Sequence, residues 1–449
     1  MARPLNRPIS RRRLHLALVI PAFLLFSITW YETAALAVMI LLFDIYLLPD
    51  LAAEAGQSGQ KEDWAGLQHS RAAIILYPIA ILLLALIFNH YLEIVAAAWA
   101  LLALGDGMAG VIGAGWGRSR LPFNREKTWE GFAAFVLFGG AGALLLMLWV
   151  NGATLGRKAL VICLAAALVG AFVESLPIRL SDNITVPLIC GGFIFCAGLV
   201  ERSALDRNLP YLGVRIILAL AINLAFALTA LALGQITASG AAAGFVLGVA
   251  VYMGFGYKSF LILLSFFVLG AAATRLGYAR KLERGVAERR RGARTWREAV
   301  GNILPAAFFS VLVITTPYQW AFLMALVASL AEAAGDTVAS EIGKWVSGRA
   351  YLITTFEPVK SGEDGGISVV GTAAGFGAST LVVLLGCGLG LCWGWNAVIV
   401  LIAALAGNLA DSLIGATLER RGLVTNSVVN FMGTSLAGAL ALAVALHWG

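Results

Sequence analysis

The stretch Gly105–Gly131 contains residue types that can bind a metal ion and a phosphate group. It carries Asp106, Lys127 and Glu130 among seven glycines, between two apolar segments. A carboxylate can hold a divalent cation, a lysine can neutralise phosphate, and glycine lets the backbone approach a ligand closely. A lone aspartate would be a helix cap, but the cluster favours a metal–nucleotide site. The expected nucleotide contacts are Gly105, Gly107, Gly113, Thr128 and Gly131.

A second polar group follows further along the same half of the chain. Glu174 ends an uncharged segment, and Asp182 lies in the loop after it. Charged side chains at a membrane boundary are costly unless they bind something. We therefore expect Glu174 and Asp182 to join Asp106 as metal ligands. A base for the hydroxyl would be a catalytic carboxylate of this half, either Glu130 or Glu174. The alternative is a loop whose polar residues only cap helices.

The second half of the chain has its own acidic group, Glu332, Asp336 and Glu341. On a helix, Glu332 and Asp336 share one face and Glu341 lies on the opposite side. We expect Gly335 to break the helix and bring the three carboxylates together. Three carboxylates with apolar flanks favour a divalent metal, and the alternative is a solvated helix face. The expected metal ligands in this half are Asp336, Glu341 and Asp411.

The segment Lys360–Ser368 opens a long uncharged stretch that Asp411 closes. A glycine-rich loop that leads into a helix N-terminus can bind phosphate. We expect Lys360 to neutralise the charge of the phosphate during catalysis. The alternative is that this segment is only a turn between two elements. The other expected phosphate contacts are Gly365, Gly366 and Ser368.

The chain that presents these residues has 449 residues, of which 60% are hydrophobic and 13% charged. Soluble domains are about 25% charged. Uncharged runs long enough to cross a bilayer recur, which predicts an all-α, polytopic membrane protein with about fifteen spans. The candidate spans are 14–29, 33–48, 72–88, 91–104, 131–150, 158–174, 185–200, 213–233, 237–255, 258–274, 300–315, 318–334, 367–385, 393–410 and 426–446.

Charge bias predicts the orientation in the cell inner membrane. With a cytoplasmic N-terminus and a retained first span, all but six of the 32 Lys and Arg residues fall on the cytoplasmic side. Both expected sites then face the cytoplasm, where nucleotides are found. The basic segment Arg275–Arg297 favours a loop near anionic lipid rather than a nucleic-acid site. The oligomeric state is left open.

The polar features follow one order in both halves, which predicts two consecutive membrane domains, residues 1–204 and 205–449. Asp106, Lys127 and Glu174 correspond in order to Asp336, Lys360 and Asp411. The repetition indicates either an old duplication or convergence on one solution.

The first half resembles the phytol kinase/dolichol kinase group, which is related to phosphatidate cytidylyltransferases. The resemblance rests on Arg11-Arg12-x-x-His15, on Gly105-Asp106-Gly-x-Ala109 followed by Lys127-Thr-x-Glu130-Gly131, and on the later acidic residues. It covers about residues 5–200. Glu126 departs from the pattern, because a cation more often precedes the lysine. The resemblance implies phosphorylation of an isoprenoid alcohol with CTP and Mg²⁺ (or Mn²⁺).

The second half resembles the phytyl-phosphate kinase family over about residues 210–446. The matching pieces include Asp336-Thr-x-Ala-Ser-Glu341, Gly365-Gly-Ile-Ser368 and Asp411-Ser-x-x-Gly415. This resemblance implies addition of a second phosphate to an isoprenyl phosphate. A fusion of the two would convert a prenyl alcohol, such as phytol, farnesol or geranylgeraniol, into its diphosphate within the bilayer. The alternatives are a CTP-dependent lipid-phosphate cytidylyltransferase and, from a different class, a lipid or isoprenoid transporter.

Overall fold

The structure is a computed structural model that describes residues 19–47, 71–152, 154–288, 292–346 and 348–448. It divides into two compact units, Met1–Gly198 and Leu199–Gly449. Twelve helices in the described residues are long and apolar enough to cross a membrane, and Ile74–Ile87 and Asp182–Gly198 are shorter apolar helices. The expected all-α polytopic fold is confirmed. Of the predicted first span, 14–29, residues 14–18 lie outside the described part, and the rest contains only the short 3₁₀ helix η1, Ile20–Phe26.

The first unit is a bundle of helices that pack around a core rich in alanine. Its elements are η1, α2 (Trp30–Leu42), the π-helical η2 (Phe43–Leu47), α5 (Arg71–Ile87), α6 (Leu92–Ala100), the π-helical η3 (Leu101–Asp106), α7 (Gly107–Gly115), α8 (Trp129–Ala134), the π-helical η4 (Phe135–Gly139), α9 (Gly140–Asn151), α10 (Arg157–Ser175) and α11 (Asp182–Gly198). Buried Trp99 donates a hydrogen bond to Tyr77 Oη at 2.9 Å, so the polar atoms of both rings are satisfied inside this core.

Asp106 does not lie where the sequence suggested, at the end of an apolar helix. The helix that begins at Leu92 continues through the π-helical turn η3 to Gly115. The turn widens the helix where η3 packs against η4, and Gly139 approaches the Cα of Gly105 closely. Such π-helical turns are frequent at functional sites. A continuous, largely buried helix therefore positions Asp106, rather than a loop.

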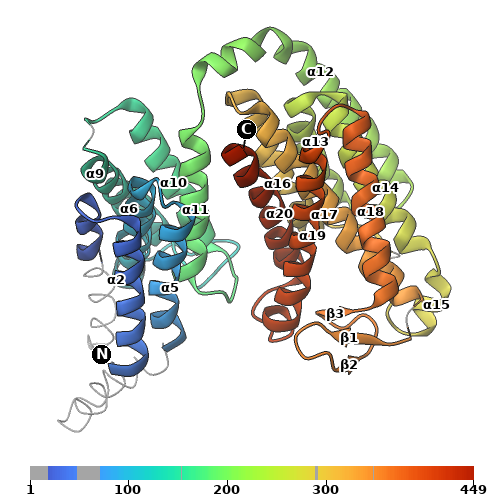
Figure 1. The fold of residues 1–449 in the computed structure, drawn as a ribbon, viewed down its shortest axis with the longest axis horizontal. Coiled ribbons are helices and arrows are strands. Elements are labelled where there is room, and N and C mark those ends of the chain that lie inside the picture. The colour runs from blue at the N-terminus through green and yellow to red at the C-terminus, as the bar shows by residue number, and fades with distance from the viewer. Residues whose placement is uncertain (1–18, 48–70, 153, 289–291, 347, 449) are drawn as a thin grey trace. The chain divides into compact units, whose positions relative to one another are not determined.

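The second unit is organised around the long helix α17. Figure 1 shows α17 among α16, α18 and α20. The elements of this unit are α12 (Arg202–Ala232), α13 (Ala238–Phe255), α14 (Tyr257–Arg275), α15 (Tyr278–Glu283), α16 (Trp296–Thr315), α17 (Gln319–Val346), β1 (Ala350–Leu352), β2 (Pro358–Val359), β3 (Gly366–Ile367), α18 (Val369–Gly388), α19 (Trp395–Ile414), the π-helical η6 (Gly415–Glu419) and α20 (Asn426–Trp448). A small antiparallel sheet, in the order β2-β1-β3, covers one end of the unit.

The expected break at Gly335 is wrong, because α17 runs unbroken through it. A glycine inside a helix costs about 1 kcal/mol relative to alanine, but here the missing side chain has a packing role. A Cβ at Gly335 would lie 3.2 Å from the carbonyl oxygen of Gly375 and would also collide with Ser379 Oγ. The glycine lets α18 approach α17, and this contact keeps the polar end of α17 helical.

Candidate functional site

Three carboxylates of the first unit converge as the sequence predicted. Asp106 comes from η3, Glu174 from the last turn of α10 and Asp182 from the first turn of α11. Each offers an oxygen within 4.8 Å of the others, the one such group of three His, Cys, Asp or Glu side chains in the described residues. Oxygen ligands at this spacing suit a hard divalent cation such as Mg²⁺ or Mn²⁺.

Lys127 lies against these three carboxylates. Its ammonium group binds Glu174 directly and lies 3.6 Å from Asp182 Oδ2. Burial alone would lower the pKa of Lys127, but Glu174, Asp182 and Asp106 outweigh this effect and raise it. Lys127 is therefore charged across the physiological pH range. One ammonium against three carboxylates leaves a net negative charge that a divalent cation can compensate.

The loop that carries Lys127 is held in place by hydrogen bonds. The amide of Leu121 donates to the carbonyl of Lys127 at 3.0 Å, and Lys127 N donates to Asn124 O at 3.2 Å. Asn124 Nδ2 then donates to Ser175 O at 3.1 Å, which ties the loop to the end of α10. The residue beside Glu174 thus anchors the loop that brings Lys127 to Glu174.

Glu130 and the glycines of this stretch have structural contacts. Glu130 is half-buried and accepts hydrogen bonds from the amides of Arg118 and Ser119, each at 3.0 Å, so the structure does not bring it to the carboxylate group. Gly105 and Gly107 are buried within helical segments. A Cβ at Gly105 would lie 2.9 Å from the ring of Phe135. Gly105 thus allows the helix to pack closely against Phe135, and whether Gly105 and Gly107 contact a nucleotide stays a prediction.

In the second unit, Asp336 and Asp411 lie together, and Glu332 lies one turn before Asp336. The carboxyl groups of Asp336 and Asp411 are close enough to interact directly. A Cβ on Gly433 of α20 would lie 2.6 Å from Glu332 Oε1 and 3.3 Å from Asp411 Oδ2, so both carboxylates border the same point of α20. The second acidic group therefore consists of Glu332, Asp336 and Asp411. The sequence had drawn attention to Glu332 but had not placed it among the metal ligands.

This second group contains buried polar atoms without partners. Both carboxylate oxygens of Glu332, Oδ2 of Asp411 and Oδ1 of Asn430 are buried and make no hydrogen bond. Buried charges without a compensating partner are strongly unfavourable. Glu332 Oε1 and Asp411 Oδ2 border the same point of α20, and carboxylate oxygens are the ligands that a hard divalent cation takes.

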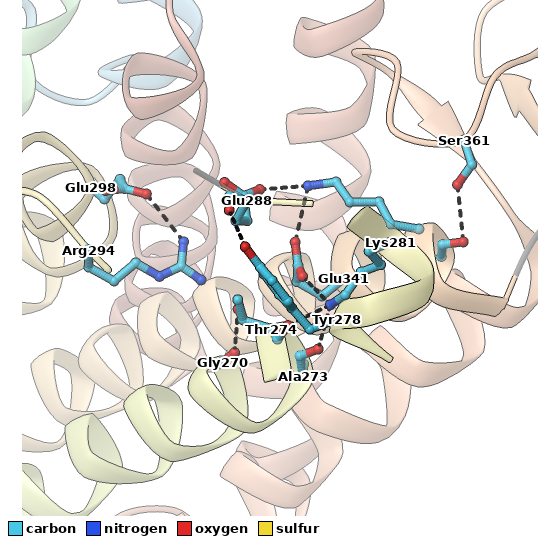
Figure 2. Close-up of polar contacts among 12 residues, drawn as sticks. Gly270, Ala273, Thr274, Tyr278, Lys281, Glu288, Arg294, Glu298, Glu341 and Ser361 are labelled. Atoms are coloured by element: carbon cyan, nitrogen blue, oxygen red, sulfur yellow. Dashed lines mark hydrogen bonds and ion pairs between the residues drawn. The ribbon is translucent and has the colours of Figure 1, made fainter. Parts of the chain in front are cut away.

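Glu341 is held by cations. Figure 2 shows its carboxylate beside Lys281, whose Nζ lies 2.6 Å from Glu341 Oε2, and Lys344 Nζ lies 3.1 Å from Glu341 Oε1. Lys281 is fully buried and also donates to the carbonyls of Ala273 and Thr274 at the end of α14. This network fastens α15 to α14 and α17. The unbroken α17 explains the difference from the sequence expectation, because it points Glu341 away from Glu332.

The Glu288–Lys344 ion pair yields a pH prediction. Their charged atoms lie 2.7 Å apart. Burial alone would raise the pKa of Glu288, but Lys344 outweighs it and lowers the pKa below the ordinary 4.5. The pair therefore stabilises the fold above about pH 4.5 and loses this effect as pH falls through the depressed pKa. Thermal unfolding in detergent should show Glu288→Gln less stable than wild type at pH 7, with the difference vanishing in acid. An equal difference at both pH values would contradict this origin.

The predicted phosphate loop of the second unit is a folded structure. Lys360 is exposed between β2 and β3, whereas the cations that the structure places near Asp336 are Lys344 and Arg294. Gly365 has φ of 71° and packs against Ala416 so closely that no side chain fits. Gly366 lies in β3, and Ser368 Oγ accepts from Gly371 N at 3.1 Å as the N-cap of α18. Their expected phosphate contacts stay predictions.

The two units repeat one local arrangement of a cap and two glycines. In the first, Thr128 Oγ1 accepts from Gly131 N at 3.1 Å, as Ser368 does from Gly371 in the second. The glycine seven residues after each aspartate faces this cap. A Cβ at Gly113 would lie 3.1 Å from Thr128 Oγ1, and one at Gly343 would lie 3.3 Å from Ser368 Oγ. The repeated geometry extends the repeated order of the sequence motifs.

Comparison with known proteins identifies the family. A family model described as integral membrane protein DUF92 matches residues 221–438. An uncharacterized membrane protein of Synechocystis is 38% identical over 202 residues, which cover 44% of this chain and 78% of that protein. The chain belongs to the DUF92 family of integral membrane proteins. No solved structure is significantly similar to it.

Other relatives connect this DUF92 chain to kinases. The chloroplast protein VTE6 of Arabidopsis thaliana is 36% identical over 214 residues, 46% of this chain and 64% of that protein. Phytol kinase 1 of the same plant is 32% identical over 125 residues, 25% of this chain and 40% of that protein. The expected relation to phytol kinases is thus confirmed at the level of a phytol-kinase-related membrane protein. Because only part of each protein aligns, the activity of this chain is a proposal.

Sequence reasoning did not single out Arg294, Lys281 or Lys344 as members of a site. Lys281 and Arg294 lie in the basic segment Arg275–Arg297, which predicted a loop near anionic lipid, and Lys344 follows the acidic residues of the second half. The buried position of Lys281 depends on the short helix α15, which folds back beneath α14. Arg11, Arg12 and His15, which carried part of the family resemblance, lie outside the described residues.

Proposed function

We propose that this protein phosphorylates an isoprenoid alcohol to its monophosphate and then to its diphosphate, using CTP. The observation that carries this proposal is the convergence of Asp106, Glu174 and Asp182 around the loop that presents Lys127. Relatives named phytol kinases support the choice of substrate class. The second unit has its own acidic group and adds the second phosphate in this proposal, and VTE6 is among the relatives of the chain.

Asp106, Glu174 and Asp182 would hold Mg²⁺ or Mn²⁺ in the first unit, and Glu332, Asp336 and Asp411 would hold it in the second. The bound ion would offset the charge of the nucleotide phosphates during transfer. The carboxylate-only donor set of the first unit and the partnerless buried oxygens of the second both fit such an ion.

The residues of the first unit have complementary roles in alcohol phosphorylation. Lys127 stabilises the negative charge of the transferred phosphoryl group. The hydroxyl oxygen attacks the terminal phosphorus, the bond to the leaving nucleoside diphosphate breaks, and the hydroxyl proton passes to a carboxylate. Asp182 is suited to accept it, because its side chain is 35% exposed whereas that of Glu174 is 6% exposed. In the second unit the acceptor is already a phosphate anion and needs no base.

The cytoplasmic orientation, the inner-membrane location and the use of CTP belong to this proposal. The excess of Lys and Arg in the loops on the side of both acidic groups supports the orientation. Fusion of two kinases in one chain would keep the monophosphate in the bilayer between the two transfers.

The test is the product that purified protein in lipid nanodiscs makes from farnesol, CTP and Mg²⁺. Farnesyl monophosphate followed by farnesyl diphosphate, with two CDP released for each diphosphate, is the expected result. Release of pyrophosphate would instead indicate a cytidylyltransferase. Absence of any phosphorylated product from prenyl alcohols of ten to twenty carbons would overturn the proposal, and nucleotide-independent movement across proteoliposomes would favour a transporter.

A further inference from the structure

The second unit contains a cavity that does not belong to either acidic group. It lies between α12, α13, α14 and the start of α16. Most of its wall is apolar, with Phe226, Leu263, Phe266 and Phe267 among the larger side chains. Its volume of about 70 Å³ is several times the 10–15 Å³ that one water requires. An interior of this kind favours a hydrocarbon chain over a polar ligand.

One end of the cavity is polar and cationic. Arg275, Arg294, Glu298 and Asn302 line it there. Figure 2 shows the Arg294 guanidinium directed toward Glu298, with Nη1 3.4 Å from Oε1. A guanidinium has five N–H donors in a planar fork that matches phosphate geometry, more than this one contact uses. The cavity thus combines an apolar interior with a phosphate-binding end.

The backbone around Arg294 is built to hold that side chain in place. Arg294 N donates to Gln235 O at 2.9 Å, and its carbonyl accepts from Thr237 N at 3.0 Å. The carbonyl also lies against Gly240, where no side chain would fit. These contacts attach Arg294, near the end of the basic segment Arg275–Arg297, to the start of α13.

The polar end of the cavity adjoins the second acidic group. Arg294 is close enough to Asp336 to interact with it electrostatically. Asn302, which lines the cavity, accepts a hydrogen bond at 3.3 Å from Asn430, whose Oδ1 is one of the partnerless buried atoms. A phosphate bound at Arg294 would therefore lie within electrostatic reach of Asp336 while its hydrocarbon chain occupied the cavity.

We propose that this cavity binds the isoprenyl monophosphate, with its phosphate on Arg294 and its chain between α12, α13 and α14. The inference rests on the proposed function, since it supplies the acceptor site for the second phosphate transfer. It also assigns chain-length selection to the wall of the cavity, where Gly244 contributes no side chain.

Gly244 allows a direct test. Gly244 lines the cavity, and a Cβ there meets no atom within 4 Å, so the backbone leaves room for a side chain to begin at this wall. Gly377 in α18 has the same open surroundings, but it does not line the cavity. Gly377→Leu is therefore the matched control for Gly244→Leu.

The experiment is equilibrium binding of farnesyl and isopentenyl monophosphates to the full chain in nanodiscs, without nucleotide. Gly244→Leu should weaken binding of the fifteen-carbon ligand by about tenfold or more and spare the five-carbon ligand. Gly244→Ala should give a smaller loss, and Gly377→Leu none. Arg294→Gln should weaken binding of both ligands. Thermal unfolding of each variant identifies any that fail to fold.

Each outcome decides between the cavity and the proposed function. Wild-type affinity of Gly244→Leu for farnesyl monophosphate, or lack of saturable binding to wild type, would overturn the cavity assignment. Binding as expected without any phosphate transfer would leave the cavity as a lipid-phosphate site and remove the kinase proposal. Diphosphate formation with unchanged chain-length preference in Gly244→Leu would support the kinase proposal and overturn the cavity assignment.

Discussion

Asp106→Asn is expected to lower the rate of farnesol phosphorylation by about 100-fold or more, because it removes one charge from the proposed metal-binding group. Asparagine has nearly the same shape, so the contacts of η3 with η4 should survive. The loss should appear in the first transfer alone. Farnesyl monophosphate supplied directly should still be converted to the diphosphate at the wild-type rate.

A control for this variant lies on the same continuous helix. Glu93 is in the first turn of α6, and Asp106 lies about 20 Å along the helix at 1.5 Å per residue. Glu93→Gln should leave both transfers unchanged. Wild-type phosphorylation of farnesol by Asp106→Asn would remove Asp106 from the first site. Equal loss of both transfers would show that the two units do not act separately.

The helices were largely predictable because the length of an apolar run is a strong signal. Fourteen of the fifteen expected spans overlap apolar helices of the structure. The ends of the helices were less predictable. The expected span 91–104 ends before Asp106, and Gly335 was expected to break its helix. Both residues lie inside helices, where a neighbouring helix packs directly against Gly105 and Gly335. Local sequence carries no information about that neighbour.

The candidate site was partly predictable, because Glu174 and Asp182 lie at the adjoining ends of α10 and α11. Asp106 converges with them from inside a continuous helix. Side-chain partners were not predictable in the same way. Glu341 belongs with Lys281 because α15 turns back under α14, and Glu130 belongs with the amides of Arg118 and Ser119. Both pairings depend on loop paths that residue spacing does not determine.

The two acidic groups differ in a way that bears on their chemistry. The first includes Lys127, held by direct contact with Glu174. The second has partnerless carboxylate oxygens, while nearby Lys344 is paired with Glu288 and Glu341. A second transfer would therefore depend on Arg294 for contact with the acceptor phosphate.

Asp336→Asn is accordingly expected to stop the reaction at the monophosphate. Farnesol and CTP should yield farnesyl monophosphate at the wild-type rate, while diphosphate formation should fall by about 100-fold or more. The reason is that Asp336 interacts with Asp411 and also with the cations Arg294 and Lys344, so it would contact both the metal and the acceptor phosphate region. Product analysis by mass spectrometry over time measures both steps.

Asp206→Asn is the matched control, since Asp206 is an exposed residue of α12 paired with Arg202 at 3.7 Å. It should form diphosphate normally. Asp106→Asn and Asp336→Asn proteins reconstituted in the same vesicles should restore diphosphate formation, because the monophosphate made by one can diffuse through the bilayer to the other. Diphosphate made by Asp336→Asn alone at the wild-type rate would refute the division of the two transfers between the two units.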